Sequence, residues 1–233
     1  MIYYLYKRDT GEYVGTSETP IDCAFVGSTT KTPPQTKEHQ KLVFDSDANQ
    51  WKVVYDFRGV WYNKKTKESI VIDKLGEKVD LTLYTNKRPC EFCVWDDNVN
   101  DWVFSLDLYK QHCITKLLEQ YQKYLISKEN VLRLIGFTSI IARCLVILST
   151  NKTLTDQQIE KLASFIEQSD KLFCWISDVT KYELSLENQL KQATSKSEVD
   201  QIMQSVNFEQ FDSTYPNISL ADKMIFISGL SLE

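Results

Sequence analysis

The hydrophobic pattern changes once along the chain, near Phe104. Before that point apolar and polar residues tend to alternate, as in residues 51–55, which is the period of a half-buried strand. After it the apolar residues recur every three or four positions, which is the period of a helix that packs along one face. The pattern therefore predicts an α+β fold, with a β-rich domain of hairpins and meanders over residues 1–105 and an antiparallel helical bundle over residues 106–233.

Turn residues divide the β-rich half into short segments. The segment from Ile2 to Tyr6 is strand-like, and Asp9-Thr10-Gly11 predicts a hairpin turn behind it. Residues 18–41 contain three prolines and few large apolar groups, so they predict an extended loop with only short structure. Residues 44–62 predict a β-meander that is held together by aromatic side chains.

A tight turn is expected inside this meander, at Asp56-Phe57-Arg58-Gly59. Gly59 can adopt a positive φ, which residues with a Cβ atom rarely do. Asp56 and Arg58 are close enough in sequence for a charge-assisted hydrogen bond across the turn. We therefore predict that Asp56, Arg58 and Gly59 hold this turn together, and the sequence leaves open whether Arg58 instead faces a partner.

A short internal repeat is visible in the β-rich half. Phe44 precedes Trp51 by seven residues, and Trp95 precedes Trp102 by the same interval, with an aspartate after the first aromatic residue in both cases. Pro34 and Pro89 precede the two units. We infer two small hairpins that are anchored by tryptophan, although aspartate-rich turns are common enough for the likeness to arise by chance.

Apolar stripes predict several helices in the second half. One extends from Leu117 to Leu148, and a capping box at residues 155–158 predicts the start of the next. Its stripe from Leu162 to Leu190 is interrupted by polar Ser169 and Glu183 and is typical of a bundle or a short coiled coil. Two shorter helices are expected to follow, with caps at Ser195 and Glu198 and at Ser219, the last covering Leu220, Met224 and Ile227.

Composition indicates a globular protein without a nucleic-acid or membrane surface. Hydrophobic residues make up 42% and charged residues 25% of the 233 positions, and the net charge of -5 argues against a surface for phosphate groups. The apolar segment Val131–Leu148 contains Arg133 and Arg143, and a central arginine costs roughly 3 kcal/mol in a bilayer. No basic and apolar leader precedes Ile2, so we expect a cytoplasmic chain.

The cysteines are too thinly spread for a disulfide scaffold, so we expect reduced thiols. They are Cys23, Cys90, Cys93, Cys113, Cys144 and Cys174. Weak candidates for a zinc site are Cys90, Cys93, His112 and Cys113. A second Cys-x-x-Cys is missing, and adjacent His and Cys residues rarely bind one ion, so we predict no metal.

The sequence gives little support for catalysis. Only His39 and His112 are present, and neither a phosphate-binding glycine loop nor a His-Glu-x-x-His motif occurs. Paired catalytic carboxylates of the glycosidase type leave no sequence signature, so the sequence does not exclude them. We expect no enzyme activity and no cofactor.

Aromatic residues are the strongest remaining signal for function. The chain has 12 Tyr, 11 Phe and 5 Trp, many of them in the first hundred residues. Exposed aromatic side chains favour protein or sugar recognition, whereas buried ones form a small β core. The candidate partner-binding residues are Trp61, Tyr62, Arg58 and Tyr13. A carbohydrate-binding module is the alternative function.

The order of the motifs in residues 3–104 resembles that of phage tail fibre assembly proteins. The motifs are Thr10-Gly11-Glu12-Tyr13-Val14-Gly15, Pro33-Pro34, Trp51, Asp56-Phe57-Arg58-Gly59, Leu75-Gly76, and Trp95-Asp96 with Trp102. In that family the turn usually reads Asp-His-Arg-Gly, and here Phe57 replaces the histidine. The helical remainder resembles the family only in being helical, since it is longer and lacks the tryptophan-rich ending of many members.

The resemblance implies a chaperone from a bacteriophage or prophage. Such proteins bind the distal part of a tail fibre and allow its trimer to form, so the implied partner is a tail fibre protein, with self-association as a further expectation. Neither nucleic acid nor a membrane is implied. With the resemblance, the alternative function is a carbohydrate-binding or structural module at the tip of a virion. The implied location is the cytoplasm of the host bacterium, with retention at the tip of the tail fibre as the alternative.

Overall fold

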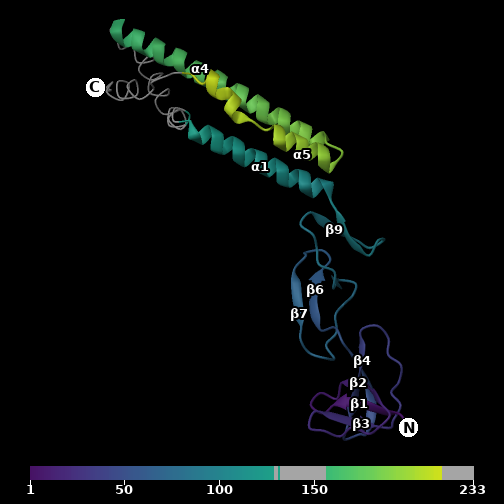
Figure 1. Cartoon of the computed structure of the whole chain (residues 1–233). Helices are drawn as coiled ribbons and strands as arrows, with labels where there is room; N and C mark the ends of the chain where they lie inside the picture. The colour runs from purple at the N-terminus through teal and green to yellow at the C-terminus, as the bar shows by residue number, and fades with distance from the viewer. Residues whose placement is uncertain (129–130, 132–155, 217–233) are drawn as a thin grey trace. The chain divides into compact units, whose positions relative to one another are not determined.

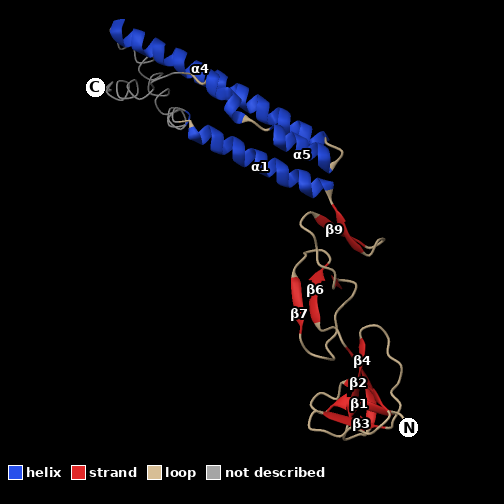
Figure 2. Cartoon of the chain, viewed as in Figure 1, coloured by secondary structure: helices blue, strands red, loops and turns tan. Residues whose placement is uncertain are grey.

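The computed structural model describes residues 1–128, 131 and 156–216, and these separate into strands and helices (Figures 1 and 2). The chain divides into two compact units, Met1–Phe104 and Ser105–Glu233. The described strands all lie in the first unit and the described helices in the second, which confirms the α+β fold class. Each unit is described by itself below.

The described strands form four antiparallel sheets. The first contains β1 (Tyr3–Lys7), β2 (Tyr13–Ser17) and β3 (Val26–Thr29), in the order β2-β1-β3. The second pairs β4 (Gln40–Asp45) with β5 (Gln50–Tyr55). The third has the order β7-β6-β8 and contains β6 (Gly59–Asn63), β7 (Ser69–Ile72) and β8 (Tyr84–Thr85). The fourth pairs β9 (Cys93–Asp96) with β10 (Asp101–Phe104).

The predicted meander over residues 44–62 is wrong in one respect. Strand β5 pairs with β4, whereas β6 pairs with β7 and β8, so β5 and β6 belong to different sheets. Residues 56–58 therefore connect two sheets and do not form a hairpin turn. The end of β5 bonds elsewhere, since the Tyr55 carbonyl accepts from the Gly76 N–H at 2.8 Å and the Asp56 N–H donates to the His39 carbonyl at 2.9 Å. Arg58 bonds to Asp56, as predicted, and also to Glu12. The predicted loop over residues 18–41 contains one short strand, β3, and ends in the first two residues of β4.

Four hairpins in the described residues share one turn plan. Each has a four-residue loop, at residues 8–11, 46–49, 64–67 and 97–100. The fourth loop residue has a positive φ in every case: Gly11 at 71°, Asn49 at 48°, Lys67 at 64° and Asn100 at 51°. A left-handed residue at this position gives the twist that lets the two strands pair after a type I turn.

A side chain at the start of the loop stabilises three of these hairpins. Asp45 Oδ1 accepts hydrogen bonds from the backbone N–H groups of Asp47 and Ala48, at 3.1 and 2.9 Å. Asn63 Oδ1 accepts from two loop N–H groups in the same way, at 2.9 and 3.0 Å, and Asp96 Oδ1 accepts from one at 2.8 Å. Asp and Asn are suited to this because their short polar side chains reach the backbone two residues ahead.

The helical unit contains α1 (Leu106–Ser127), α4 (Asp156–Gln192), α5 (Lys196–Ser205) and a 3-10 helix, η1 (Phe208–Thr214). Helix α1 packs on α4 and α5, and α4 packs on α5 and η1. Ser195 accepts a hydrogen bond from the Glu198 N–H and caps α5, as predicted. The sequence did not reveal η1.

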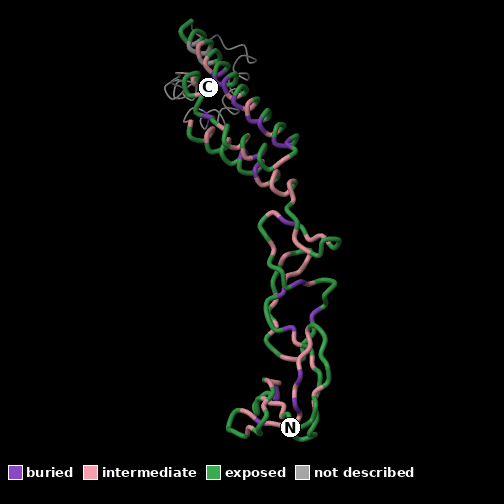
Figure 3. Tube along the Cα trace, turned by 45° about the vertical axis from the view of Figure 1, so that its right-hand side comes forward, coloured by how far each residue is buried: buried purple, intermediate pink, exposed green. Residues whose placement is uncertain are grey.

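The predicted stripe on α4 is buried along much of its length (Figure 3). Its polar interruptions, Ser169 and Glu183, are buried together with the apolar positions around them. The core of the unit consists of Cys113, Leu117, Val131, Leu172, Trp175, Val179, Leu186, Leu190, Ala193, Val199 and Phe208. The antiparallel bundle in its full extent stays a prediction.

Several sequence predictions fall outside the described residues. They concern the segment Val131–Leu148 beyond its first residue, the cap at Thr155, and the last helix with Ser219, Leu220, Met224 and Ile227. Within the described part of the chain, every helix is too short or too polar to cross a membrane.

Candidate functional site

An ionic cluster joins the first hairpin to the connection after β5. The Arg58 guanidinium donates to Glu12 Oε1 at 2.9 Å and to Asp56 Oδ1 and Oδ2 at 2.7 and 2.9 Å. Lys41 Nζ lies 3.4 Å from Glu12 Oε2 and 3.6 Å from Asp56 Oδ2. Two carboxylates and two cations are therefore held together by residues from three parts of the sequence.

The electrostatics of this cluster favour the charged forms of Glu12, Asp56 and Arg58. The hydrogen bond from Arg58 lowers the pKa of Asp56 to about 2 and lowers the pKa of Glu12 as well. The hydrogen bonds that Arg58 donates raise its own pKa, and the bond to Asp56 has a larger effect than the bond to Glu12. Glu12 is only 7% exposed, so the guanidinium supplies the charge that its burial requires. The cluster is a structural ion network, in which the Arg58 guanidinium already bonds to Asp56 and Glu12.

Two glycines next to this cluster have positive φ for different reasons. Gly59 has φ 134° and open space around the position of a Cβ atom, so only its backbone conformation demands glycine. Gly11 has φ 71°, and a Cβ atom there would lie 2.5 Å from the Phe44 carbonyl oxygen. Its own carbonyl accepts from the Phe44 N–H at 2.8 Å. Gly11 thus allows the first hairpin to approach β4 closely.

Trp61 lies in the core of the first unit, which corrects the expectation that it faces a partner. It is only 4% exposed, and its Nε1 donates to the Phe57 carbonyl at 2.6 Å. Phe57 and Val79 are buried with it, and the His39 ring stacks on Phe57 at 4.8 Å. Burial of the indole and the paired N–H leave no accessible ring face for stacking.

The other three candidate partner residues come from separate parts of the β unit. Tyr13 is half-buried in β2 and meets Trp51 edge to face at 5.7 Å. Tyr62 is half-buried in β6, opposite Ser69 and Thr85. Arg58 lies in the connection between β5 and β6. Their proposed role as partner contacts stays a prediction.

The two tryptophan hairpins predicted from the sequence repeat are built alike. Trp51 pairs with Phe44 across β4 and β5, and Trp102 pairs with Trp95 across β9 and β10. Trp51 and Trp102 also donate their indole N–H groups to backbone carbonyls in the loops that precede their hairpins. The acceptors are the carbonyls of Lys31 (2.7 Å) and Lys87 (2.9 Å). Both accepting lysines stand two residues before a proline. The likeness therefore extends from the sequence to the hydrogen bonds.

Beside the second tryptophan hairpin lies a cavity of about 380 Å³, which we call the tryptophan hollow. It is lined by Asn63, Lys64, Lys65, Lys67, Thr82, Leu83, Val94, Trp95, Asp97 and Trp102. These residues come from the β6–β7 loop, the segment before β8, and the β9–β10 hairpin. Lys64 joins the parts, since its Nζ donates to the Leu81 carbonyl at 2.8 Å and lies 4.8 Å from the centre of the Trp95 ring.

The ring geometry in the hollow does not provide a flat platform. Trp95 and Trp102 meet edge to face, with an interplanar angle of 79°, and Lys64 covers one face of Trp95. A sugar-binding platform requires exposed and coplanar ring faces. The observed pair therefore weighs against the carbohydrate-binding alternative.

The cysteines require a correction. Cys90 and Cys93 form a disulfide, with their Cα atoms 5.4 Å apart, so these two are not the free thiols that the sequence led us to expect. Cys23 and Cys174 are free and exposed, and Cys113 is free and buried, where burial raises the pKa of its thiol. Cys144 lies outside the described residues. The described residues contain no group of His, Cys, Asp and Glu that could hold a metal ion.

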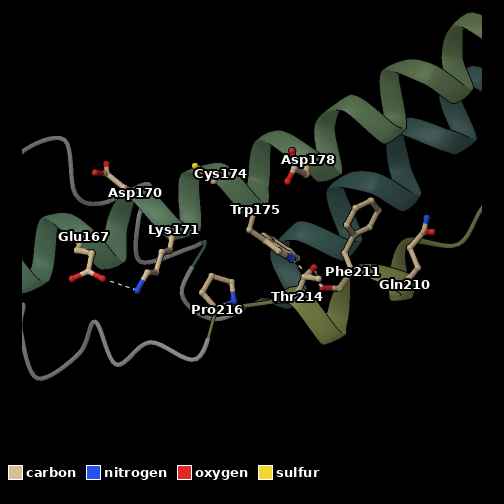
Figure 4. A pocket seen from close by; sticks show the side chains of 10 residues that line it. All are labelled: Glu167, Asp170, Lys171, Cys174, Trp175, Asp178, Gln210, Phe211, Thr214 and Pro216. Atoms are coloured by element: carbon tan, nitrogen blue, oxygen red, sulfur yellow. Dashed lines mark hydrogen bonds and ion pairs between the residues drawn. The ribbon is translucent and has the colours of Figure 1, made fainter.

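A larger pocket, of about 730 Å³, lies in the helical unit between α4 and η1 (Figure 4). Trp175 and Phe211 line it with Pro216, and the Trp175 Nε1 donates to the Phe211 carbonyl at 3.0 Å. Acidic side chains from α4 lie around it, and Lys171 pairs with Glu167 at 2.7 Å. Cys174 is the nucleophilic thiol in this lining, and no histidine lines the pocket to activate it. We therefore see no catalytic arrangement there.

Comparison with known proteins gives one partial match. The chain is 31% identical over 97 residues to the protein named Tail fiber assembly protein of Enterobacteria phage T4. The matched region covers 41% of this chain and 51% of that protein, so the chain spans about half the length of the relative. No family model matches the chain, and no solved structure matches it.

Sequence patterns revealed some of these features and missed others. The spacing of Phe44 to Trp51 and of Trp95 to Trp102 was visible, and the hairpin turn at residues 9–11 was predicted, but the loop plan that all four hairpins share was not recognised. The sequence signal for this plan is a Lys, Asp or Asn just before the loop, followed four residues later by the Gly, Asn or Lys that has the positive φ. The Glu12 to Arg58 bond joins residues 46 positions apart, and no local pattern signals it.

Proposed function

We propose that this protein takes part in phage tail fibre assembly by binding the fibre polypeptide and promoting its folding into a trimer. The observation that supports this most is the partial identity to the phage T4 protein whose name states a part in tail fibre assembly. The order of motifs in residues 3–104 points the same way. The proposal involves no catalysis, and the protein acts through contacts alone.

The β unit has features that suit such a partner. A growing β-structured fibre exposes unpaired strand edges, and covering these edges prevents wrong pairing. In the described part of the chain, β5, β9 and β10 each have a partner strand on one side only, whereas β4 is also bridged to Glu12 on its other side. Val94, Val103 and Phe104 also expose apolar surface on the β9–β10 hairpin. An extended segment of the fibre could add to such an edge and place side chains against that surface.

The helical unit has a different role in this proposal, which is self-association. Ile159, Ile166 and Phe173 are each about half exposed on α4, and they are seven residues apart. Apolar residues at that interval recur on one face of a helix and form the seam of a coiled coil. We therefore assign the fibre contact to the β unit and assembly with a second copy to this face of α4.

The proposal places the protein in the cytoplasm of the host bacterium, because the fibre polypeptide is synthesised there. Two fates follow: it leaves after the trimer forms, or it stays at the fibre tip. Mass spectrometry of purified particles distinguishes them, since a retained protein is recovered with the fibre.

Co-expression tests the proposal directly. The fibre polypeptide encoded beside this protein is expressed with and without it, and SDS-resistant trimers are measured on gels without heating. We expect trimers to depend on the protein. Equal trimer yields in both samples would reject the proposal. A glycan array with the purified protein serves as the control for the carbohydrate alternative, and we expect no binding there.

A further inference from the structure

The tryptophan hollow has an apolar floor that is open to a partner. Trp95 and Trp102 form one part of it, and Leu83 and Val94 add aliphatic surface. Leu83 is 53% exposed and Val94 is 45% exposed, although both are large apolar residues in a cavity. Apolar residues gathered in a hollow and still in contact with water favour association with another apolar group.

The charge around the hollow is positive, in contrast to the chain as a whole. Lys64, Lys65 and Lys67 face one acidic residue, Asp97, whereas the whole chain has a net charge of -5. Asp97 is already occupied, because it accepts from the Trp95 Nε1 at 2.8 Å and lies 3.9 Å from Lys64 Nζ. Within the described part of the chain, no carboxylate pairs with the ammonium groups of Lys65 and Lys67, which leaves two cations for a ligand.

The surrounding backbone favours an extended ligand. Strand β8 pairs with β6 on one side, and β9 and β10 pair only with each other among the described residues. Open strand edges therefore lie in the elements that form the hollow. In an extended segment the side chains alternate between two faces, so apolar and acidic groups at period two can reach the floor and the lysines at the same time.

We propose that the tryptophan hollow binds an extended acidic segment of the fibre polypeptide, in which apolar residues alternate with aspartate or glutamate. This identifies the chemistry of the contact and rests on the proposed function for the identity of the partner. Charge complementarity selects this occupant, because two uncommitted lysines surround an apolar floor. The edge-to-face tryptophans disfavour a sugar, and the net negative charge disfavours a nucleic acid.

Peptide binding to the full chain tests this inference. The probe is a fluorescein-labelled, capped heptapeptide in which aspartate and leucine alternate. The control peptide has lysine in place of aspartate. Fluorescence anisotropy is measured at low and high salt. We expect the acidic peptide to bind, to bind more weakly at high salt, and to bind at least about tenfold more tightly than the basic peptide. Equal binding of the two peptides would reject the proposal.

Substitutions with matched controls locate the site. The double variant K65E/K67E should weaken binding of the acidic peptide by about tenfold or more, whereas K37E/K74E has the same charge change away from the hollow and should leave it unchanged. Leu83→Asp should weaken binding, whereas Leu184→Asp, at an exposed leucine of α4, should not. Circular dichroism confirms that each variant is folded. Equal effects of a variant and its control would overturn the assignment to the hollow.

The co-expression experiment separates this inference from the proposed function. If trimers need the protein and K65E/K67E supports them as well as the unsubstituted chain, the hollow is not the fibre contact and the proposed function stands. If trimers form without the protein while the acidic peptide binds the hollow, the site stands and the fibre is not its partner. Tighter binding of a chitin oligosaccharide or of single-stranded RNA than of the acidic peptide would overturn the proposal.

Discussion

Among the described residues, each unit of this protein buries one glutamate, and the two have opposite surroundings. Glu12 in the β unit is 7% exposed and bonds to Arg58, which lowers its pKa. Glu183 in the helical unit is 3% exposed, its Oε1 has no hydrogen-bond partner in the described residues, and burial raises its pKa. The first carboxylate contributes to the fold as an anion, whereas the second weakens the fold whenever it is charged.

The contrast follows from how the two units are stabilised. The buried apolar cluster of the β unit is small and centres on Phe57, Trp61 and Val79. Repeated hairpin turns and the Arg58 network therefore contribute a large share of its order. The helical unit has a continuous apolar core along α1, α4 and α5, which can tolerate one polar interruption. Core substitutions should therefore act most strongly in the helical unit and ionic ones in the β unit.

The largest effect is expected for Leu172→Ala in the helical core. Leu172 is fully buried, and replacing a buried leucine by alanine costs about 2–5 kcal/mol, because apolar contacts are lost and a cavity remains. Hydrogen exchange should show lost protection in α1, α4 and α5 while the β strands keep theirs. Leu184→Ala, at a half-exposed leucine of the same helix, is the control and should change stability by about 0.5 kcal/mol or less. Equal losses in both units would contradict their separate stabilisation.

Arg58→Ala should have the next largest effect, this time in the β unit. It leaves Glu12 buried without its cation, and we expect a loss of about 2–3 kcal/mol, less than for a fully buried pair because Arg58 is partly exposed. Urea unfolding measures it, and Arg88→Ala, at an exposed arginine, is the control. Adding Glu12→Gln to Arg58→Ala should recover part of the loss. No recovery would show that packing, not charge, explains the effect.

The same network contributes to the response of the β unit to acid. The pKa of Asp56 is lowered from 3.8 to about 2, and the pKa of Glu12 is lowered from 4.5. Native carboxylates thus stay charged where unfolded ones bind protons, so their stabilisation is present above about pH 4.5 and is lost as the pH falls toward 2. Arg58→Ala should remove most of this dependence, which urea unfolding between pH 2 and pH 5 would measure.

Glu183→Leu is expected to stabilise the helical unit. The raised pKa of Glu183 means that the native state keeps its proton above the ordinary value of 4.5, so stability is lost as the pH rises from there through the native pKa. A leucine completes the apolar stripe and should add about 1–3 kcal/mol at pH 7, with less gain near pH 4.5. Glu160→Leu, at an exposed glutamate of the same helix, is the control. A gain that is independent of pH would contradict the role of ionisation.

The sequence predicted what depends on near neighbours. The stripe with Ser169 and Glu183, the cap at Ser195 and the seven-residue spacing before Trp51 and Trp102 all come from local periods and turn chemistry. The burial of Trp61 and the pairing of Arg58 with Glu12 depend on contacts between residues far apart in the chain. An aromatic residue of a small sheet lies on one of the two faces of that sheet. Whether this face is covered depends on segments that are distant in the sequence.

The smallest effect is expected at the hairpin loops. Lys67 has φ 64°, and a residue with a Cβ atom is strained there, whereas glycine is not. Lys67→Gly should therefore stabilise the β6–β7 hairpin by about 0.5–1 kcal/mol, after the greater freedom of glycine in the unfolded chain is subtracted. Lys65 occupies the same loop without a positive φ, so Lys65→Gly is the matched control and should destabilise. Urea unfolding measures both variants, and equal losses in the two would show that the left-handed fourth residue does not determine how this hairpin closes.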